Sequence, residues 1–109
     1  MVKGSRLRIT VLKKLKPKDI FGDKLPARTV NTNECETFKI GQQFLIDELG
    51  NFPEGFCPWA WKDLFTVITH LRFGEDFPWM LEKGIAIACC SDGFRPVIFK
   101  IERFDRVDK

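Results

Sequence analysis

The residues best able to do chemistry in this chain of 109 residues are its four cysteines. Cys57 directly precedes Pro58, and because proline is favoured at the first position of a helix, Cys57 is predicted to be a helix N-cap. There the sulfur would lie near unpaired N–H groups and the positive end of the helix dipole, which favour a thiolate. We therefore expect Cys57 to be an activated cysteine; the alternative is a small, buried apolar residue.

The other three cysteines lie in different settings. Cys89 and Cys90 are neighbours at the end of a predicted strand, where successive side chains point to opposite faces. Cys89 shares its face with Ile85 and Ile87, which we expect to be the packing face. Cys90 is expected on a face of small residues, where another element or a cofactor could approach closely. Cys35 lies in a polar loop, an exposed position.

Together the cysteines could hold a metal ion or an iron–sulfur cluster, or act as a redox pair such as Cys57 with Cys90. A metal site would use Cys35, Cys57 and one or both of Cys89 and Cys90. The sequence has no Cys-x-x-Cys pair, and the spacing matches no standard zinc or iron–sulfur signature. Both forms stay open at this point, and the positions of the four sulfurs decide between them.

Five further residues carry side chains that could bind a ligand or take part in catalysis. His70, the single histidine, is expected on the solvent face of a helix rather than as a base or ligand. Arg95 precedes a proline and is held extended, so it could bind an anion or pair with an acid. Asp92 is expected to be a turn residue beside it. Trp59 and Trp61 are expected in the core or in a pocket wall.

The elements that would position these residues follow from hydrophobic periodicity and turn residues. In chain order they are a strand Arg6–Val11, an irregular loop Lys16–Glu36, a strand Phe38–Asp47, a helix Pro58–Arg72, and two strands, Ile85–Cys89 and Pro96–Phe104. The fold class is therefore predicted to be α+β: a small antiparallel sheet of about four strands with one amphipathic helix. The sheet could be rolled into a partial barrel.

Three local patterns support this order. Leu7, Ile9 and Val11 alternate with polar residues, which is typical of a half-buried strand. The helix carries an apolar stripe at helical spacing and a glycine stop just beyond its end. The residues of the stripe are Trp61, Leu64, Phe65, Ile68 and Leu71, and the stop is Gly74. An Asp-Gly pair at 92–93 predicts a hairpin between the last two strands.

Composition limits the class of protein. With 44% hydrophobic and 30% charged residues, the chain has enough apolar material for one core, so we expect a single domain over 1–109. No apolar run approaches the roughly 20 residues that span a bilayer. The basic first residues lack the apolar stretch of a signal peptide. We therefore expect a cytoplasmic, reducing location and no membrane partner, in which cysteines are thiols or ligands rather than disulfides.

The formal net charge of +3 conceals an asymmetry, because residues 1–28 carry nine Lys or Arg and two Asp while the rest of the chain is net acidic. A basic end could contact nucleic acid. A solvated edge explains it better, because no aromatic residue lies among the charges of residues 1–20 to stack on bases. Nucleic acid is therefore the least favoured partner.

Two long motifs resemble those of a known family. They are Gly55-Phe56-Cys57-Pro58-Trp59-Ala60-Trp61 and Cys89-Cys90-Ser91-Asp92-Gly93-Phe94-Arg95-Pro96-Val97, with Phe77-Pro78-Trp79-Met80 between them. The chain from Cys35 to Arg103 is similar to an uncharacterised family of small bacterial and archaeal proteins, frequent in anaerobes. The resemblance implies no established activity. It implies an anaerobic setting in which thiol or metal chemistry would be unsurprising.

Three functions follow from the sequence as hypotheses. The first is a cysteine-centred site for a metal, a cluster or a redox-active small molecule, with Cys57 as thiolate, Cys90 and Cys35 as its partners, and Arg95 as an anion-binding neighbour. The alternative is a non-catalytic interaction or self-assembly module, in which the cysteines are structural and the partner is a protein or a second copy. Nucleic-acid binding through the basic N-terminal region is third. Whether the chain is an enzyme stays open.

Overall fold

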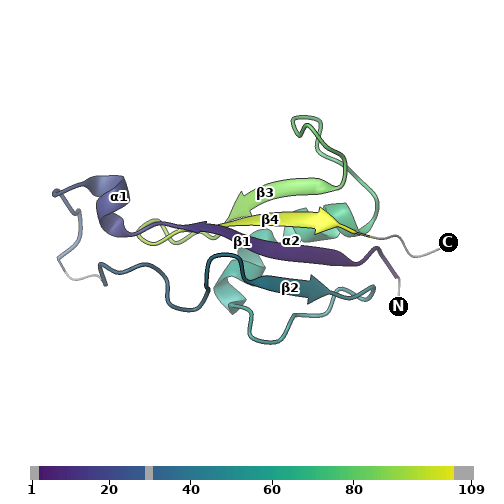
Figure 1. Cartoon of the computed structure of the whole chain (residues 1–109), viewed down its shortest axis with the longest axis horizontal. Coiled ribbons are helices and arrows are strands. Elements are labelled where there is room, and N and C mark those ends of the chain that lie inside the picture. Colours follow the sequence, from purple (N-terminus) through teal and green to yellow (C-terminus); the bar gives the residue numbers. More distant parts are fainter. Residues whose placement is uncertain (1–2, 29–30, 105–109) are drawn as a thin grey trace.

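The structure is a computed structural model that describes residues 3–28 and 31–104. It contains four strands and two helices: β1 (Leu7–Lys14), α1 (Pro17–Phe21), β2 (Gln43–Ile46), α2 (Pro58–Arg72), β3 (Ile85–Cys89) and β4 (Val97–Arg103). The strands form one sheet, and the short helix α1 projects beyond one end of it (Figure 1). The predicted α+β class is confirmed.

The sheet has the strand order β2-β1-β4-β3, and every neighbouring pair is antiparallel. The first strand is therefore central, paired with β2 on one side and with the last strand on the other. A bulge at Leu12 shifts the register between β1 and β4. The sheet is open, with β2 and β3 at its edges, so the partial barrel is not formed.

One face of the sheet is covered by α2, and the core lies between them (Figure 1). The strands contribute the alternating residues that the sequence predicts. Leu7, Ile9 and Ile46 are fully buried, while Leu45 is 64% exposed on the other side. Burial of these large apolar side chains drives the association of helix and sheet, at roughly 1.5–3 kcal/mol for each. No helix in the described part of the chain is both long and apolar enough to cross a bilayer.

Two element boundaries differ from the prediction. The irregular loop Lys16–Glu36 contains α1, whose start is fixed by Pro17 at the first helical position and by the Asp19 carboxylate, which accepts a hydrogen bond from the Lys16 N–H at 2.9 Å. The second strand is shorter than Phe38–Asp47, because Gly41 turns the chain with a φ of +85° just before β2. Helix α2 matches its predicted range.

The buried side of α2 also differs from the predicted stripe. Ala60, Leu64, Ile68 and Leu71 are buried, whereas Phe65 is 51% exposed. The stripe is therefore rotated towards Ala60, which lets the helix lie close to the sheet. Phe65 and Trp61 belong to its margin.

The prediction that Ile85, Ile87 and Cys89 form the packing face of β3 is wrong. Ala86 and Cys90 are buried under α2, while Ile87 is 49% exposed and Cys89 lies on the open side of the sheet. Small side chains are needed where helix and strand backbones approach closely, and this requirement outweighs the greater hydrophobicity of isoleucine. The prediction that another element approaches the small-residue face is confirmed, and that element is α2.

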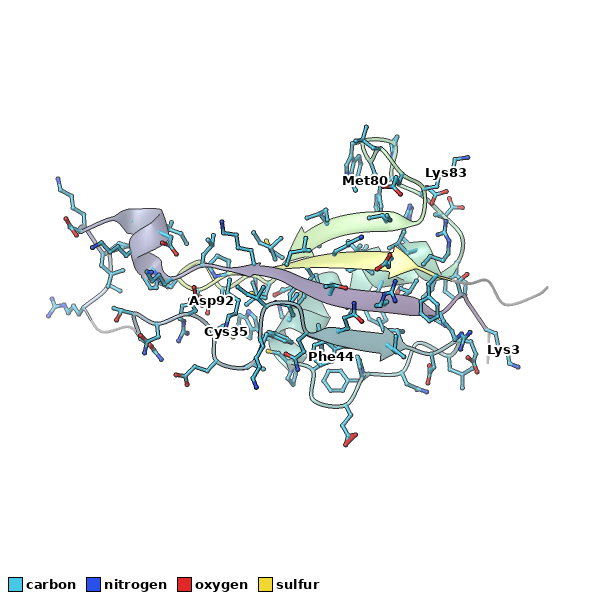
Figure 2. All side chains as sticks on the ribbon, viewed as in Figure 1. Lys3, Cys35, Phe44, Met80, Lys83 and Asp92 are labelled. Carbon is cyan, nitrogen blue, oxygen red and sulfur yellow. The ribbon has the colours of Figure 1, made fainter. Side chains whose placement is uncertain are left out.

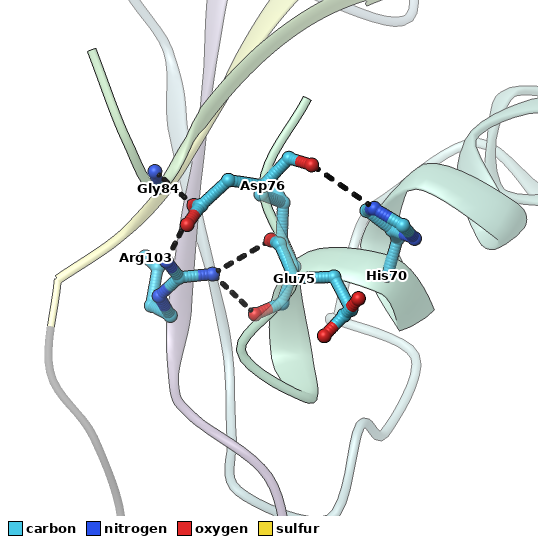
Figure 3. Close-up of polar contacts among 6 residues, drawn as sticks. His70, Glu75, Asp76, Gly84 and Arg103 are labelled. Carbon is cyan, nitrogen blue, oxygen red and sulfur yellow. Dashed lines mark hydrogen bonds and ion pairs between the residues drawn. The ribbon is translucent and has the colours of Figure 1, made fainter. Parts of the chain in front are cut away.

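The C-terminal end of α2 is fixed to the sheet by a polar cluster (Figure 3). The Arg103 guanidinium donates to the Leu71 carbonyl at 2.9 Å and to the Glu75 carbonyl at 3.1 Å. It also pairs with Asp76 at 2.7 Å, and Asp76 accepts a hydrogen bond from the Gly84 N–H. Gly74 has a φ of +87°, which confirms the predicted glycine stop. Arg103 thus adds a second donor to the Leu71 carbonyl, which also accepts from the Gly74 N–H at 3.2 Å, and links the helix end to the chain that follows it.

Candidate functional site: a pocket lined by three cysteines

A pocket of about 660 Å³ lies at the other end of α2, and three cysteines line it: Cys35, Cys57 and Cys90. They come from the loop before β2, the start of α2 and the end of β3. Asp92 and Arg95 from the β3–β4 connection line the same pocket. Cys35 and Asp92 lie at this end of the sheet in Figure 2. The volume falls within the roughly 300–1,000 Å³ of small-molecule sites.

Cys57 is the N-cap residue of α2, as predicted, with Pro58 in the first helical turn. Its side chain makes no hydrogen bond to the first-turn N–H groups, and the first turn holds no acidic residue. The first turn of α2 therefore adds no negative charge of its own next to Cys57. A negative charge that develops on a group at this position is stabilised by the helix.

Cys90 occupies a closed position in the pocket wall. Its Sγ accepts a hydrogen bond from the Val97 N–H at 3.3 Å, and its own N–H donates to the Val97 carbonyl at 3.1 Å. Burial raises the pKa of the Cys90 thiol above its ordinary value. Cys90 is therefore expected to stay protonated. Cys89 does not line the pocket and is exposed on the opposite face of the sheet.

Cys35 lies on a loop that is anchored to the end of β1. The Lys14 ammonium donates to the carbonyl of Cys35 at 3.0 Å and to that of Phe38 at 2.8 Å, which anchors this loop to the end of β1. Lys14 also lies 3.8 Å from the Glu34 carboxylate. Cys35 is only partly exposed, and it packs against the core. The exposed setting predicted for Cys35 is therefore wrong.

Arg95 and Asp92 interact with each other at the pocket rim. The Asp92 carboxylate accepts from the N–H groups of Phe94 and Arg95, which confirms its role as a turn residue, and it pairs with the Arg95 guanidinium at 3.3 Å. The Arg95 Nε is buried and has no hydrogen-bond partner among the described residues. The guanidinium is thus partly neutralised by Asp92 and keeps one donor free.

The two tryptophans separate. Trp59 lines the pocket and is 57% exposed, so it forms an outer wall. Trp61 does not line it. Instead Trp61 makes edge-to-face contacts with Phe52 and Phe65, at ring distances of 5.4 and 5.9 Å, on another side of the helix. Among the predicted ligand-binding residues, Trp61 is therefore the one that lies outside the site.

The donor set does not form a metal centre. Over residues 3–28 and 31–104, no group of three or more His, Cys, Asp and Glu side chains is placed to hold a metal ion. Glu34 and Glu36 also line the pocket and were not foreseen, although they flank Cys35 in the sequence. Because these acids and Asp92 outnumber Arg95 among the lining residues, the pocket as a whole is not an anion site.

His70 lies outside the pocket, and it is not the freely solvated residue expected from the helix pattern. Its ring stacks on Phe77 with centroids 4.4 Å apart, and its Nε2 lies 3.4 Å from the Asp76 carbonyl oxygen. These contacts support the loop that follows α2.

Basic residues near the N-terminus form ion pairs within the protein: Arg8 pairs with Glu102 at 3.0 Å.

Comparison of the chain with family models, with curated proteins and with solved structures found no match. The resemblance to the motif family therefore stays a prediction.

Proposed function

We propose that the pocket is a thiol–disulfide site that reacts with a small, uncharged disulfide. The observation that carries the proposal is that three of the four cysteines line one pocket although 22 and 33 residues separate them along the chain. A set of packing cysteines would be expected to scatter through the core. The absence of a three-ligand group in the described part of the chain favours this redox form over the metal and cluster forms.

In this proposal the three thiols have different roles. Cys57 is the attacking sulfur, because the start of α2 stabilises negative charge there and no first-turn acid opposes it. Cys35 is the resolving sulfur, because it is partly exposed in the same pocket. Cys90 takes no part in the exchange, because burial raises the pKa of its thiol, and this outweighs the hydrogen bond that the Val97 N–H donates to its sulfur.

The reaction is a two-electron exchange. The Cys57 thiolate attacks one sulfur of the substrate disulfide R–S–S–R, the S–S bond breaks, and one RS⁻ leaves and takes up a proton. The Cys35 thiolate then attacks the Cys57 sulfur of the mixed disulfide, and the second RS⁻ leaves and is protonated. The substrate is reduced to two RSH, and the protein is oxidised to a Cys35–Cys57 disulfide.

The test is the release of thiol from hydroxyethyl disulfide by the fully reduced protein. We expect Cys57→Ser to lower the rate at least tenfold. Cys89→Ser is the matched control, because Cys89 is exposed but lies outside the pocket, and it should leave the rate unchanged. Equal rates in wild type and Cys57→Ser, or loss of the reaction in Cys89→Ser, would overturn the proposal. Elemental analysis after anaerobic purification tests the metal form, and stoichiometric metal would replace the redox proposal.

A further inference from the structure

The free edge of β3 presents unused backbone hydrogen-bonding groups. On the side facing β4, the Gly84 carbonyl accepts a hydrogen bond from the Arg103 N–H, and the Cys90 N–H donates to the Val97 carbonyl. Backbone groups alternate along an antiparallel strand, so even-numbered residues face β4 and the odd-numbered Ile85, Ile87 and Cys89 face outward. Within the described residues, no hydrogen bond reaches these outward N–H and C=O groups.

The strand at this edge has no charge, proline or bulge that would prevent pairing. The sequence Ile-Ala-Ile-Ala-Cys of β3 contains no charge and no proline, and its register with β4 is unbroken. Ile87 is 49% exposed beside it. The opposite edge is different: β2 has four residues, and Leu45 and Ile46 share a hollow with Phe52 and Pro53, so the segment after β2 lies alongside it.

The β3 sequence is complementary to itself when it is reversed. In an antiparallel pair centred on Ile87, each Ile87 lies opposite its counterpart, each Ala86 lies opposite Ala88, and each Ile85 lies opposite Cys89. Directly opposite residues point to the same face, so the isoleucines and Cys89 of both copies would form one apolar strip. All three outward residues would then donate and accept a bond, because each falls in a hydrogen-bonded pair.

The loop before β3 adds apolar surface beside this edge. Trp79 is 74% exposed and Leu81 fully so. Met80 and Lys83 lie on this loop, which rises beyond the first residues of β3 (Figure 2). Antiparallel pairing would direct the loop of each copy towards the end of the other copy's β3. A second copy therefore accounts for both the open edge and the exposed loop.

We propose that two copies of this chain associate through antiparallel pairing of β3 with β3 about Ile87, which joins their sheets into one. The pairing leaves the cysteine pocket on the covered side of each sheet, so it is independent of the thiol reaction. It requires no disulfide, because Cys89 lies opposite Ile85 rather than opposite its counterpart.

Sedimentation equilibrium of the reduced full chain over a range of concentrations tests the pairing. We expect a dimer in wild type and in Cys89→Ser. Ile87→Lys should weaken dimerisation at least tenfold, because it places two like charges directly opposite each other. Leu45→Lys is the matched control on the other edge and should remain dimeric. Circular dichroism confirms that each variant is folded.

Hydrogen exchange supplies a second readout. The amides of Ile85, Ile87 and Cys89 should exchange slowly in the dimer and at least tenfold faster in Ile87→Lys. A wild type that stays monomeric at about 0.5 mM would overturn the proposal. A folded Ile87→Lys that dimerises like wild type, or a folded Leu45→Lys that dissociates, would also overturn it.

Discussion

The two ends of helix α2 differ in how their polar groups are hydrogen-bonded. At the C-terminal end, Arg103 donates to two carbonyls and pairs with Asp76, and Arg72 donates to the Glu48 carbonyl at 2.8 Å. At the N-terminal end, the Cys57 side chain makes no capping hydrogen bond. A buried Nε without a partner among the described residues occurs at both ends, on Arg72 and on Arg95, so it does not distinguish them. The hydrogen bonds of Arg103 stabilise the first end, whereas the Cys57 side chain forms no such bond at the second.

The comparison predicts the largest loss of stability for a substitution at the closed end. Arg103→Met should lower the free energy of unfolding by about 1–3 kcal/mol, because it removes one hydrogen-bond donor from each of two carbonyls and the charged partner of the Asp76 carboxylate. Urea unfolding followed by circular dichroism measures the change. A loss below about 0.5 kcal/mol would show that the cluster does not stabilise the helix end.

Acid should weaken the C-terminal end of α2. The Arg103 guanidinium, hydrogen-bonded to Asp76, and the Gly84 N–H together hold the pKa of the Asp76 carboxyl below its ordinary value. A lowered pKa in the folded state stabilises the protein above the unfolded value of about 3.9, and the effect is lost as the pH falls through the folded value. Asp76→Asn should therefore be less stable than wild type at pH 6, and the difference should shrink towards pH 2. A difference that is constant with pH would contradict this assignment.

A substitution at the open end should have the smallest effect on stability. Arg95→Met removes a partly exposed ion pair with Asp92, so it should change the free energy of unfolding by less than about 1 kcal/mol. The same urea experiment measures it. A loss as large as that of Arg103→Met would mean that the two ends do not differ and that Arg95 is a structural residue.

Cys89, the last residue of β3, and Cys90, which follows it, allow an exposed and a buried thiol to be compared within one peptide. Cys89 is exposed, whereas Cys90 is buried, with a raised pKa. Alkylation with iodoacetamide at pH 8 should label Cys89 at least tenfold faster than Cys90 in the folded protein and equally in urea. Mass spectrometry of the peptide gives both labelling rates. Equal labelling of the two cysteines in the folded state would contradict the burial of Cys90.

Much of the fold followed from local sequence patterns. Alternation predicted the buried residues of β1, and the proline and the glycine at the two ends of α2 predicted its bounds. The packing face of β3 was mispredicted because hydrophobicity favours Ile87, whereas the close approach of α2 selects Ala86 and Cys90. Helix α1 was missed, although Pro17 and Asp19 carry the signal for its start.

The site was predictable only in part. The N-cap position of Cys57 and the turn role of Asp92 depend on neighbouring residues, and both were predicted. Cys35, Cys57 and Cys90 line one pocket because of the strand order and because Lys14 anchors a loop. Neither of these features can be predicted from the spacing of the cysteines in the sequence. The pairing of Arg103 with Asp76 spans 27 residues and was likewise not foreseen.

The central claim is that Cys57 and Cys35 react as a pair in the pocket while Cys89 and Cys90 take no part. The most direct measurement is the mass-spectrometric mapping of disulfides after the reduced protein has reacted with one equivalent of hydroxyethyl disulfide. The account predicts an intramolecular Cys35–Cys57 disulfide, with Cys89 and Cys90 still free. Modification at Cys89 alone, with the three pocket thiols unchanged, would contradict it.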